Sequence, residues 1–364
     1  MISTRGVARA AAVVAAMVLV ASGAVFGQET APWPTNWNNW NDPALWVTVG
    51  NPGNAGELSG TDAGSLATRI CGAVGYQYRI GKFEVTAGQY TTFLNAVAKT
   101  DAHGLYNINM DRHNYAYGCN IIRSGSSGNY LYSVILDYAN RPVNLVSFWD
   151  ACRFINWLNN GQPIGPQGTG TTEDGAYFLN GVTNPANGTI TRAPDARFVL
   201  PSEDEWYKAA YHKNDGVTGN YWDFPTCSDI HPGQDVTEAT NPGNNANYYN
   251  EGWAVGDPNY LTKVGEYEKS VGPYGTFDQG GNVWEWNEAI IDSTLRGARG
   301  SAFNYTWEWM PADHRVGYDP TYELYGDVGF RVSEVPEPAT LSLLALGGLL
   351  ALRCRRVAPR TDRP

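Results

Sequence analysis

The chain has 364 residues, of which 13% are aromatic, and a formal net charge of −11. This length is sufficient for one large domain or two small ones with a hydrophobic core. The acidic charge argues against nucleic-acid binding, because phosphate contacts need basic residues, and it suits an exported surface protein or one that meets cations.

The first 27 residues have the pattern of a secretory signal peptide. Arg5 and Arg9 precede an apolar run at residues 10–20, and small residues follow up to a cleavage point expected before Gln28. A first membrane helix is the weaker alternative, because the apolar run is short for a bilayer span.

The next segment, residues 28–75, is rich in Trp, Asn, Gly and Pro. It is predicted to be an irregular N-terminal leader with one short strand at residues 45–49. Alternating polar and apolar residues then predict a half-buried strand at residues 75–85. Thr86 with Gln89 three residues later forms a capping-box pattern, so a first helix is expected to follow directly.

Two further helices are predicted by the same signal, which occurs at Ser147 with Asp150 and at Ser202 with Glu205. Between the first two helices, residues 101–138 are expected to form loops and one hairpin. After residue 220 no helix is expected, only turns and short strands at residues 295–299 and 328–332. The predicted fold class is therefore α+β, irregular and loop-rich, with about three short helices and short, mostly antiparallel strands.

The most distinctive stretch is GTFDQGGNVWEW at residues 275–286. Its apolar residues follow neither the strand nor the helix period, which indicates a shaped loop. Asp278 and Glu285 supply carboxylate oxygens, and a glycine-flexed backbone can turn carbonyls to the same point, as calcium requires. The alternative is a tight core turn packed by Trp284 and Trp286.

Four cysteines lie outside the two ends of the chain. Cys71 and Cys119 are in glycine-rich segments that we expect to be exposed, and they are the favoured disulfide pair in an oxidising compartment. Four cysteines allow three pairings, and the sequence does not choose among them. Cys152 falls inside a helix pattern and is equally well explained as a small buried residue. No CxxC motif or His/Cys cluster supports a zinc or thiol-redox site.

The C-terminal segment, residues 335–364, combines Pro-Glu-Pro, an apolar run at residues 339–352 and an arginine cluster. The run is short for a membrane span. In its order of parts the segment resembles the PEP-CTERM sorting tail of Gram-negative bacteria. The resemblance implies an exosortase partner, a transient membrane contact through the tail, and export to the cell surface or extracellular matrix.

Six motifs between residues 76 and 333 occur in an order that resembles the formylglycine-generating enzyme family, also called sulfatase-modifying factor. The resemblance implies a distant variant of the C-type lectin fold. It also implies a calcium ion held by the side chains of Asp278 and Glu285 and the backbone carbonyls of Gly281 and Val283. The motifs are RIGKFEVTAGQY, RPVNLVSFWDACRFINWL, RFVLPSEDEWYKAAY, YGTFDQGGNVWEW, RGARGS and GFRV.

The same resemblance implies copper held by two cysteines shortly after the RGGS-type motif, yet this chain has Asn304 and Trp309 at those positions. Copper and formylglycine generation are therefore not expected, since Cu(I) needs soft ligands. We expect a non-catalytic module that binds a polysaccharide or matrix protein, the alternative being an oxidoreductase-type enzyme with altered metal chemistry. The candidate ligand pocket comprises Asn304, Tyr305, Trp307, Trp309, His314, Arg315 and Tyr318.

Overall fold

The computed structural model describes residues 36–62 and 64–336. The predicted signal peptide and nearly all of the predicted sorting tail lie outside this part of the chain. Within it, no helix is both long enough and apolar enough to cross a membrane.

All three predicted helices are present, and each begins directly after its predicted cap. At Thr86, Ser147 and Ser202 the hydroxyl accepts a hydrogen bond from the backbone three residues later, and the side chain of that residue accepts one from the cap backbone. These bonds satisfy donors that a helix start leaves free. The helices are α1 (Ala87–Val97), α2 (Phe148–Asn159) and α3 (Glu203–Tyr211).

One four-stranded sheet is antiparallel throughout and joins distant parts of the chain. Its strand from the predicted leader shows that the folded unit begins well before residue 76. A strand from the C-terminal end lies between two earlier strands, which fastens the two ends of the domain together. In spatial order the strands are β1 (Trp46–Val49), β4 (Tyr78–Gly81), β12 (Ser333–Glu334) and β7 (Phe198–Val199).

The second four-stranded sheet carries the regions predicted to be functional. One of its pairings, β11 with β8, is parallel and the others are antiparallel. In spatial order the strands are β10 (Val316–Tyr318), β9 (Arg296–Arg299), β8 (Trp284–Ile290) and β11 (Val328–Gly329). Two hairpins complete the strands: β2 (Glu57–Ser59) with β3 (Arg69–Cys71), and β5 (Ile121–Ser124) with β6 (Leu131–Val134).

Strand β8 was not predicted, because its first four residues are all buried. A strand buried on both faces has no polar alternation for a sequence pattern to detect. The last three residues of the predicted loop at residues 275–286 therefore begin a strand. The predicted strands at residues 75–85 and 328–332 are present only in part, as β4 and β11.

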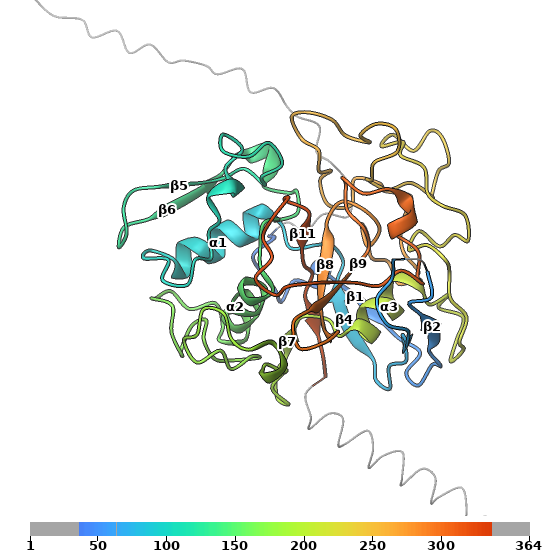
Figure 1. Cartoon of the computed structure of the whole chain (residues 1–364), viewed down its shortest axis with the longest axis horizontal. Helices are drawn as coiled ribbons and strands as arrows, with labels where there is room; N and C mark the ends of the chain where they lie inside the picture. The colour runs from blue at the N-terminus through green and yellow to red at the C-terminus, as the bar shows by residue number, and fades with distance from the viewer. Residues whose placement is uncertain (1–35, 63, 337–364) are drawn as a thin grey trace, which may run out of the picture. The chain divides into compact units, whose positions relative to one another are not determined.

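The main core is aromatic and joins α1 to α2. The ring of Phe93 lies 5.3 Å from those of both Phe154 and Trp157, measured between centroids. Figure 1 shows α1 and α2 beside the β5–β6 hairpin on one side, α3 near β2 on the other, and β8 and β9 between them. Residues from both helices, β8 and β11 share this cluster, so the central sheet is fixed rigidly.

The predicted disulfide between Cys71 and Cys119 is wrong. All four cysteines in the described residues are free thiols, and both members of the predicted pair are fully buried. Cys71 packs with α3 and Cys119 lies in the main core, so the two belong to different clusters. Glycine-rich flanks suggested exposure, but the flanks do not determine where a thiol packs.

Candidate functional site

The structure divides the predicted ligand pocket into three places. Tyr305 and Trp309 pack around Trp284, and the side chain of Asn304 lies next to Asp327 beside them. Trp307 and His314 line a neighbouring cavity, which the contact of His314 with Trp309 joins to the first place, while Arg315 points to the carboxylate of Glu203 in α3. The sequence placed these residues together because they are close along the chain, but the turns after β9 send their side chains in different directions.

The first place is an aromatic cluster at the start of β8. The Trp284 ring lies 5.4 Å from Tyr305 and 6.4 Å from Trp309, and those two rings lie 5.4 Å apart, all near perpendicular. Tyr318 packs on the same indole at 6.3 Å. Edge-to-face packing of this kind stabilises the arrangement of the rings, so the cluster presents a fixed surface.

Polar groups inside this cluster lack partners. Neither carboxyl oxygen of Asp327, nor Asn304 Oδ1, nor Trp284 Nε1 has a hydrogen-bond partner within the described structure. Burial raises the pKa of Asp327 to about 6, although the nearby side chains of Asn304 and Tyr305 oppose the rise. A carboxyl in this state can exchange hydrogen bonds with a ligand near neutral pH.

Asp327 was missed by the sequence analysis. Its signal would have been its position two residues before the GFRV motif, directly before β11. Parallel pairing of β11 with β8 brings it beside Trp284, whose backbone N–H donates to the Asp327 carbonyl. Only this long-range pairing places the carboxyl in the aromatic cluster.

The second place is a surface cavity of about 530 Å³ that Trp307 and His314 line. Its other polar walls are carboxylates, which the sequence analysis also missed because they come from distant segments. These carboxylates belong to Asp62, Asp223, Glu308 and Asp313.

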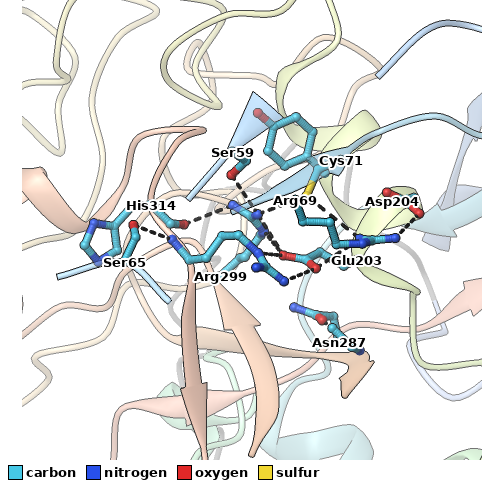
Figure 2. Close-up of polar contacts among 12 residues, drawn as sticks. Ser59, Ser65, Arg69, Cys71, Glu203, Asp204, Asn287, Arg299 and His314 are labelled. Carbon is cyan, nitrogen blue, oxygen red and sulfur yellow. Dashed lines mark hydrogen bonds and ion pairs between the residues drawn. The ribbon is translucent and has the colours of Figure 1, made fainter. Parts of the chain in front are cut away.

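The third place is a buried ion-pair network, shown in Figure 2. The Glu203 carboxylate accepts hydrogen bonds from Arg69 at 3.0 Å, Arg299 at 2.8 Å and Arg315 at 2.7 Å. Burial alone would raise the pKa of Glu203, but Arg299 and Arg315 hold it at about 2. The sulfur of Cys71 lies 3.5 Å from the Arg299 guanidinium. Because each guanidinium is already paired, this network fastens α3 to β9 and leaves little capacity for a ligand.

The predicted calcium loop contains a second buried ion pair. Both carboxylate oxygens of Glu285 bond to Arg331, and one also accepts from Trp206 Nε1 at 2.6 Å. Asp278 accepts a hydrogen bond from the backbone of Gly265, and burial raises its pKa to about 7. The sequence analysis did not foresee that an arginine would pair with Glu285.

Even so, this region contains more carboxylates than cations. Glu84 is buried beside the loop, one of its oxygens has no partner, and burial together with nearby Asp278 raises its pKa. The buried carboxylates of Glu84 and Glu285 and the half-buried carboxylate of Asp278 thus face the single guanidinium of Arg331. No group of three or more His, Cys, Asp or Glu side chains within residues 36–62 and 64–336 is arranged to hold a metal alone. A cation here would therefore need backbone carbonyls such as those predicted at Gly281 and Val283.

At Gly281 the backbone could not carry a side chain. Its φ is +80°, and an added Cβ would lie 2.2 Å from the Asn247 carbonyl oxygen. The glycine therefore allows the loop to pass directly over the segment at Asn247, with which it forms an isolated bridge. This close approach explains the glycine in the motif and fixes the position of its carbonyl.

These features define a loop-rich α+β domain with a tryptophan-bearing central strand and a glycine-turned acidic loop. The sequence matches the sulfatase-modifying factor enzyme 1-like domain over residues 67–334, and the chain belongs to this family. A PEP-CTERM protein-sorting motif matches residues 334–356. The chain is therefore an exported protein sorted by exosortase-type machinery. No curated protein matches the sequence.

Several solved structures are similar to this chain. Treponema denticola variable protein 1 is 18% identical, with a TM-score of 0.45, over 80% of this chain and 95% of that one. CarF is 19% identical with a TM-score of 0.45, and the match covers 80% of this chain and 98% of CarF. PvdO from Pseudomonas aeruginosa is 16% identical with a TM-score of 0.43, and the match covers 80% of this chain and 94% of PvdO.

Proposed function

We propose that this exported protein is a non-catalytic binding module, which uses its aromatic cluster to hold a polysaccharide or protein at the cell surface or in the extracellular matrix. The observation that carries the proposal is the identity of Asn304 and Trp309. Family enzymes use cysteines at these positions for copper, and neither an amide nor an indole replaces a thiolate as a ligand for Cu(I).

The surroundings of these two residues support binding. Asn304, Tyr305 and Asp327 offer hydrogen-bonding groups, two of them buried without partners, next to the rings of Trp284 and Trp309. Aromatic faces with a few polar groups suit stacking on a sugar or peptide and hydrogen bonding to its hydroxyl or amide groups.

Calcium is part of the proposal as a structural ion. Its ligands would be the side chains of Asp278 and Glu285 and the carbonyls of Gly281 and Val283. The surplus of buried carboxylates around Arg331 supports a cation there. Its role would be to neutralise the loop and hold it behind the aromatic cluster.

A binding screen of the exported protein against extracellular polysaccharides and matrix proteins tests the function. Trp309→Ala is expected to weaken binding at least about tenfold, as the loss of a central aromatic anchor does. Trp253→Ala removes a tryptophan that is 38% exposed outside the cluster and should leave binding unchanged. Absence of any ligand in the screen, or equal effects of the two variants, would contradict the proposal. A stoichiometric redox metal in the purified protein would favour the altered oxidoreductase instead.

A further inference from the structure

The cavity beside Trp307 adjoins the aromatic cluster, because the His314 ring that lines it lies 4.6 Å from the Trp309 ring between centroids. It has a volume of about 530 Å³ and is enclosed by residue 62, residues 223–224 and the segment at residues 307–314. Trp284, Asn304 and Tyr305 do not line it. Three segments that are far apart in the sequence therefore build a concave site that the family assignment does not explain.

The lining of this cavity is acidic. Asp62, Asp223, Glu308 and Asp313 are its charged members, together with His314, and no lysine or arginine is among its lining residues. Asp313 is occupied, since its carboxylate accepts hydrogen bonds from the backbone and hydroxyl of Thr61. The other three carboxylates form no salt bridge with any residue that the structure describes.

The two neighbouring cations are committed elsewhere. Arg299, behind the cavity wall, pairs with Glu203 at 2.8 Å and donates to the carbonyls of Ala312 and His314. Lys213 is near enough to lower the pKa of Asp223, but it is paired with Asp229 at 3.3 Å and lies over the Trp222 ring. Burial, reinforced by Asp229 and Asp62, raises the pKa of Asp223 overall. The cavity therefore lacks a positive charge that its carboxylates could bind.

His314 adds an unused hydrogen-bonding group. Its side chain is 5% exposed, it lines the cavity, and its Nε2 has no hydrogen-bond partner. Burial, together with nearby Arg299, lowers the pKa of His314, although Asp62 and Asp313 oppose the change, so the environment favours the neutral ring. A neutral imidazole has one nitrogen able to accept a hydrogen bond from a ligand N–H.

The apolar wall selects a slim ligand. One face of the Trp307 indole is covered by His231 at 4.7 Å between centroids, and Phe224 lies tilted at 6.3 Å. An aliphatic stem with a charged head can lie along this wall while its head reaches the carboxylates. A guanidinium also donates several N–H groups in a plane and attracts aromatic rings.

We propose that this cavity binds an arginine side chain of a basic protein partner, with the guanidinium between Asp223 and Glu308 and the stem against Trp307. The inference names a partner class for the proposed binding function and rests on it. An organic cation fits better than a metal ion, because in residues 36–62 and 64–336 no three acidic, His or Cys side chains converge on one point.

Isothermal titration of the exported protein with acetyl-Gly-Arg-Gly-amide tests this inference. The matched probe replaces arginine with citrulline, which keeps the shape and removes the charge, and a glucosamine trimer tests a cationic sugar. The double variant Asp223→Asn with Glu308→Gln removes two cavity carboxylates that are largely exposed. The control Asp195→Asn removes an exposed carboxylate that does not line the cavity.

The arginine peptide is expected to bind the wild-type protein, and the double variant should bind it about tenfold more weakly or worse. Asp195→Asn and the citrulline probe show whether the charge in the cavity, and not the total charge of the protein or peptide, determines the affinity. Asp195→Asn should keep wild-type affinity, and citrulline should bind at least about tenfold more weakly. The inference is overturned if the arginine peptide does not bind, if citrulline binds equally, or if only the glucosamine trimer binds. None of these results changes the outcome of the matrix screen with Trp309→Ala. Failure of the arginine site can therefore be told apart from failure of the proposed binding function.

Discussion

The buried pair of Glu285 and Arg331 provides the sharpest test of how the acidic loop is held. Both side chains are 0% exposed, and Glu285 also accepts the indole hydrogen bond of Trp206. Glu285→Ala would leave the Arg331 guanidinium buried without its carboxylate. Loss of one partner of a buried ion pair costs about 3 to 5 kcal/mol in the free energy of unfolding.

The assay is urea unfolding followed by tryptophan fluorescence, in calcium and in chelator. A loss is expected in both conditions, because the ion pair with Arg331 does not depend on calcium, and it should be larger in calcium, because Glu285 is also a proposed calcium ligand. The matched control is Asp229→Ala, which breaks the Lys213–Asp229 pair, whose side chains are 28% and 51% exposed. Exposed pairs contribute about 1 kcal/mol or less, so the control should stay within that range.

A double-mutant cycle then isolates the pairing. Glu285→Ala combined with Arg331→Met removes both charges, so the combined loss should be smaller than the sum of the single losses by about 1 to 3 kcal/mol. Additive losses, or a cost of under about 1 kcal/mol for Glu285→Ala, would show that the two groups are not coupled and would refute this account of the loop.

Three further outcomes follow from the site. The pKa of Asp327 is raised from 3.8 to about 6, so its contribution to stability is present below about pH 4 and is lost as the pH rises through 6. Above pH 6 the free energy of unfolding of Asp327→Asn should therefore exceed that of the wild type by up to about 3 kcal/mol. Parallel pH profiles of the two proteins would contradict this. Calcium at 100 times its Kd should stabilise the wild type by about 2.7 kcal/mol in thermal unfolding but not Asp278→Asn, and equal calcium effects would rule out Asp278 as a ligand. Thiol titration of residues 28–336 should detect all four cysteines after denaturation without reductant. In the native state only half-buried Cys227 should react, and slowly, because burial raises the pKa of its thiol to about 11; a missing thiol would indicate a disulfide.

Local signals predicted the helices well. The capping boxes at Thr86, Ser147 and Ser202 use hydrogen bonds between residues three apart, so the sequence alone contains all of the information they need. The β5–β6 hairpin was equally predictable, because its turn is a short glycine and serine run. The α+β class follows from these elements.

The site depended on pairings between distant segments, and the sequence does not reveal these. Asp327 reaches Trp284 only through the parallel pairing of β11 with β8. Arg331, two residues beyond β11, pairs with Glu285 of β8. The acidic cavity joins residue 62 to residues 223–224 and 307–314. Proximity along the chain suggested one pocket after β9, whereas the fold distributes those side chains among three places.

The central claim is that the family's copper position has become a binding surface at Asn304 and Trp309. Titration of the purified exported protein with Cu(I), in competition with a chromophoric chelator, tests it most directly. The account predicts no tight copper site in the wild type, because thiolate ligands are absent from residues 296–331. One equivalent of Cu(I) bound more tightly than by the chelator, and released by Asn304→Ala or Trp309→Ala, would contradict it.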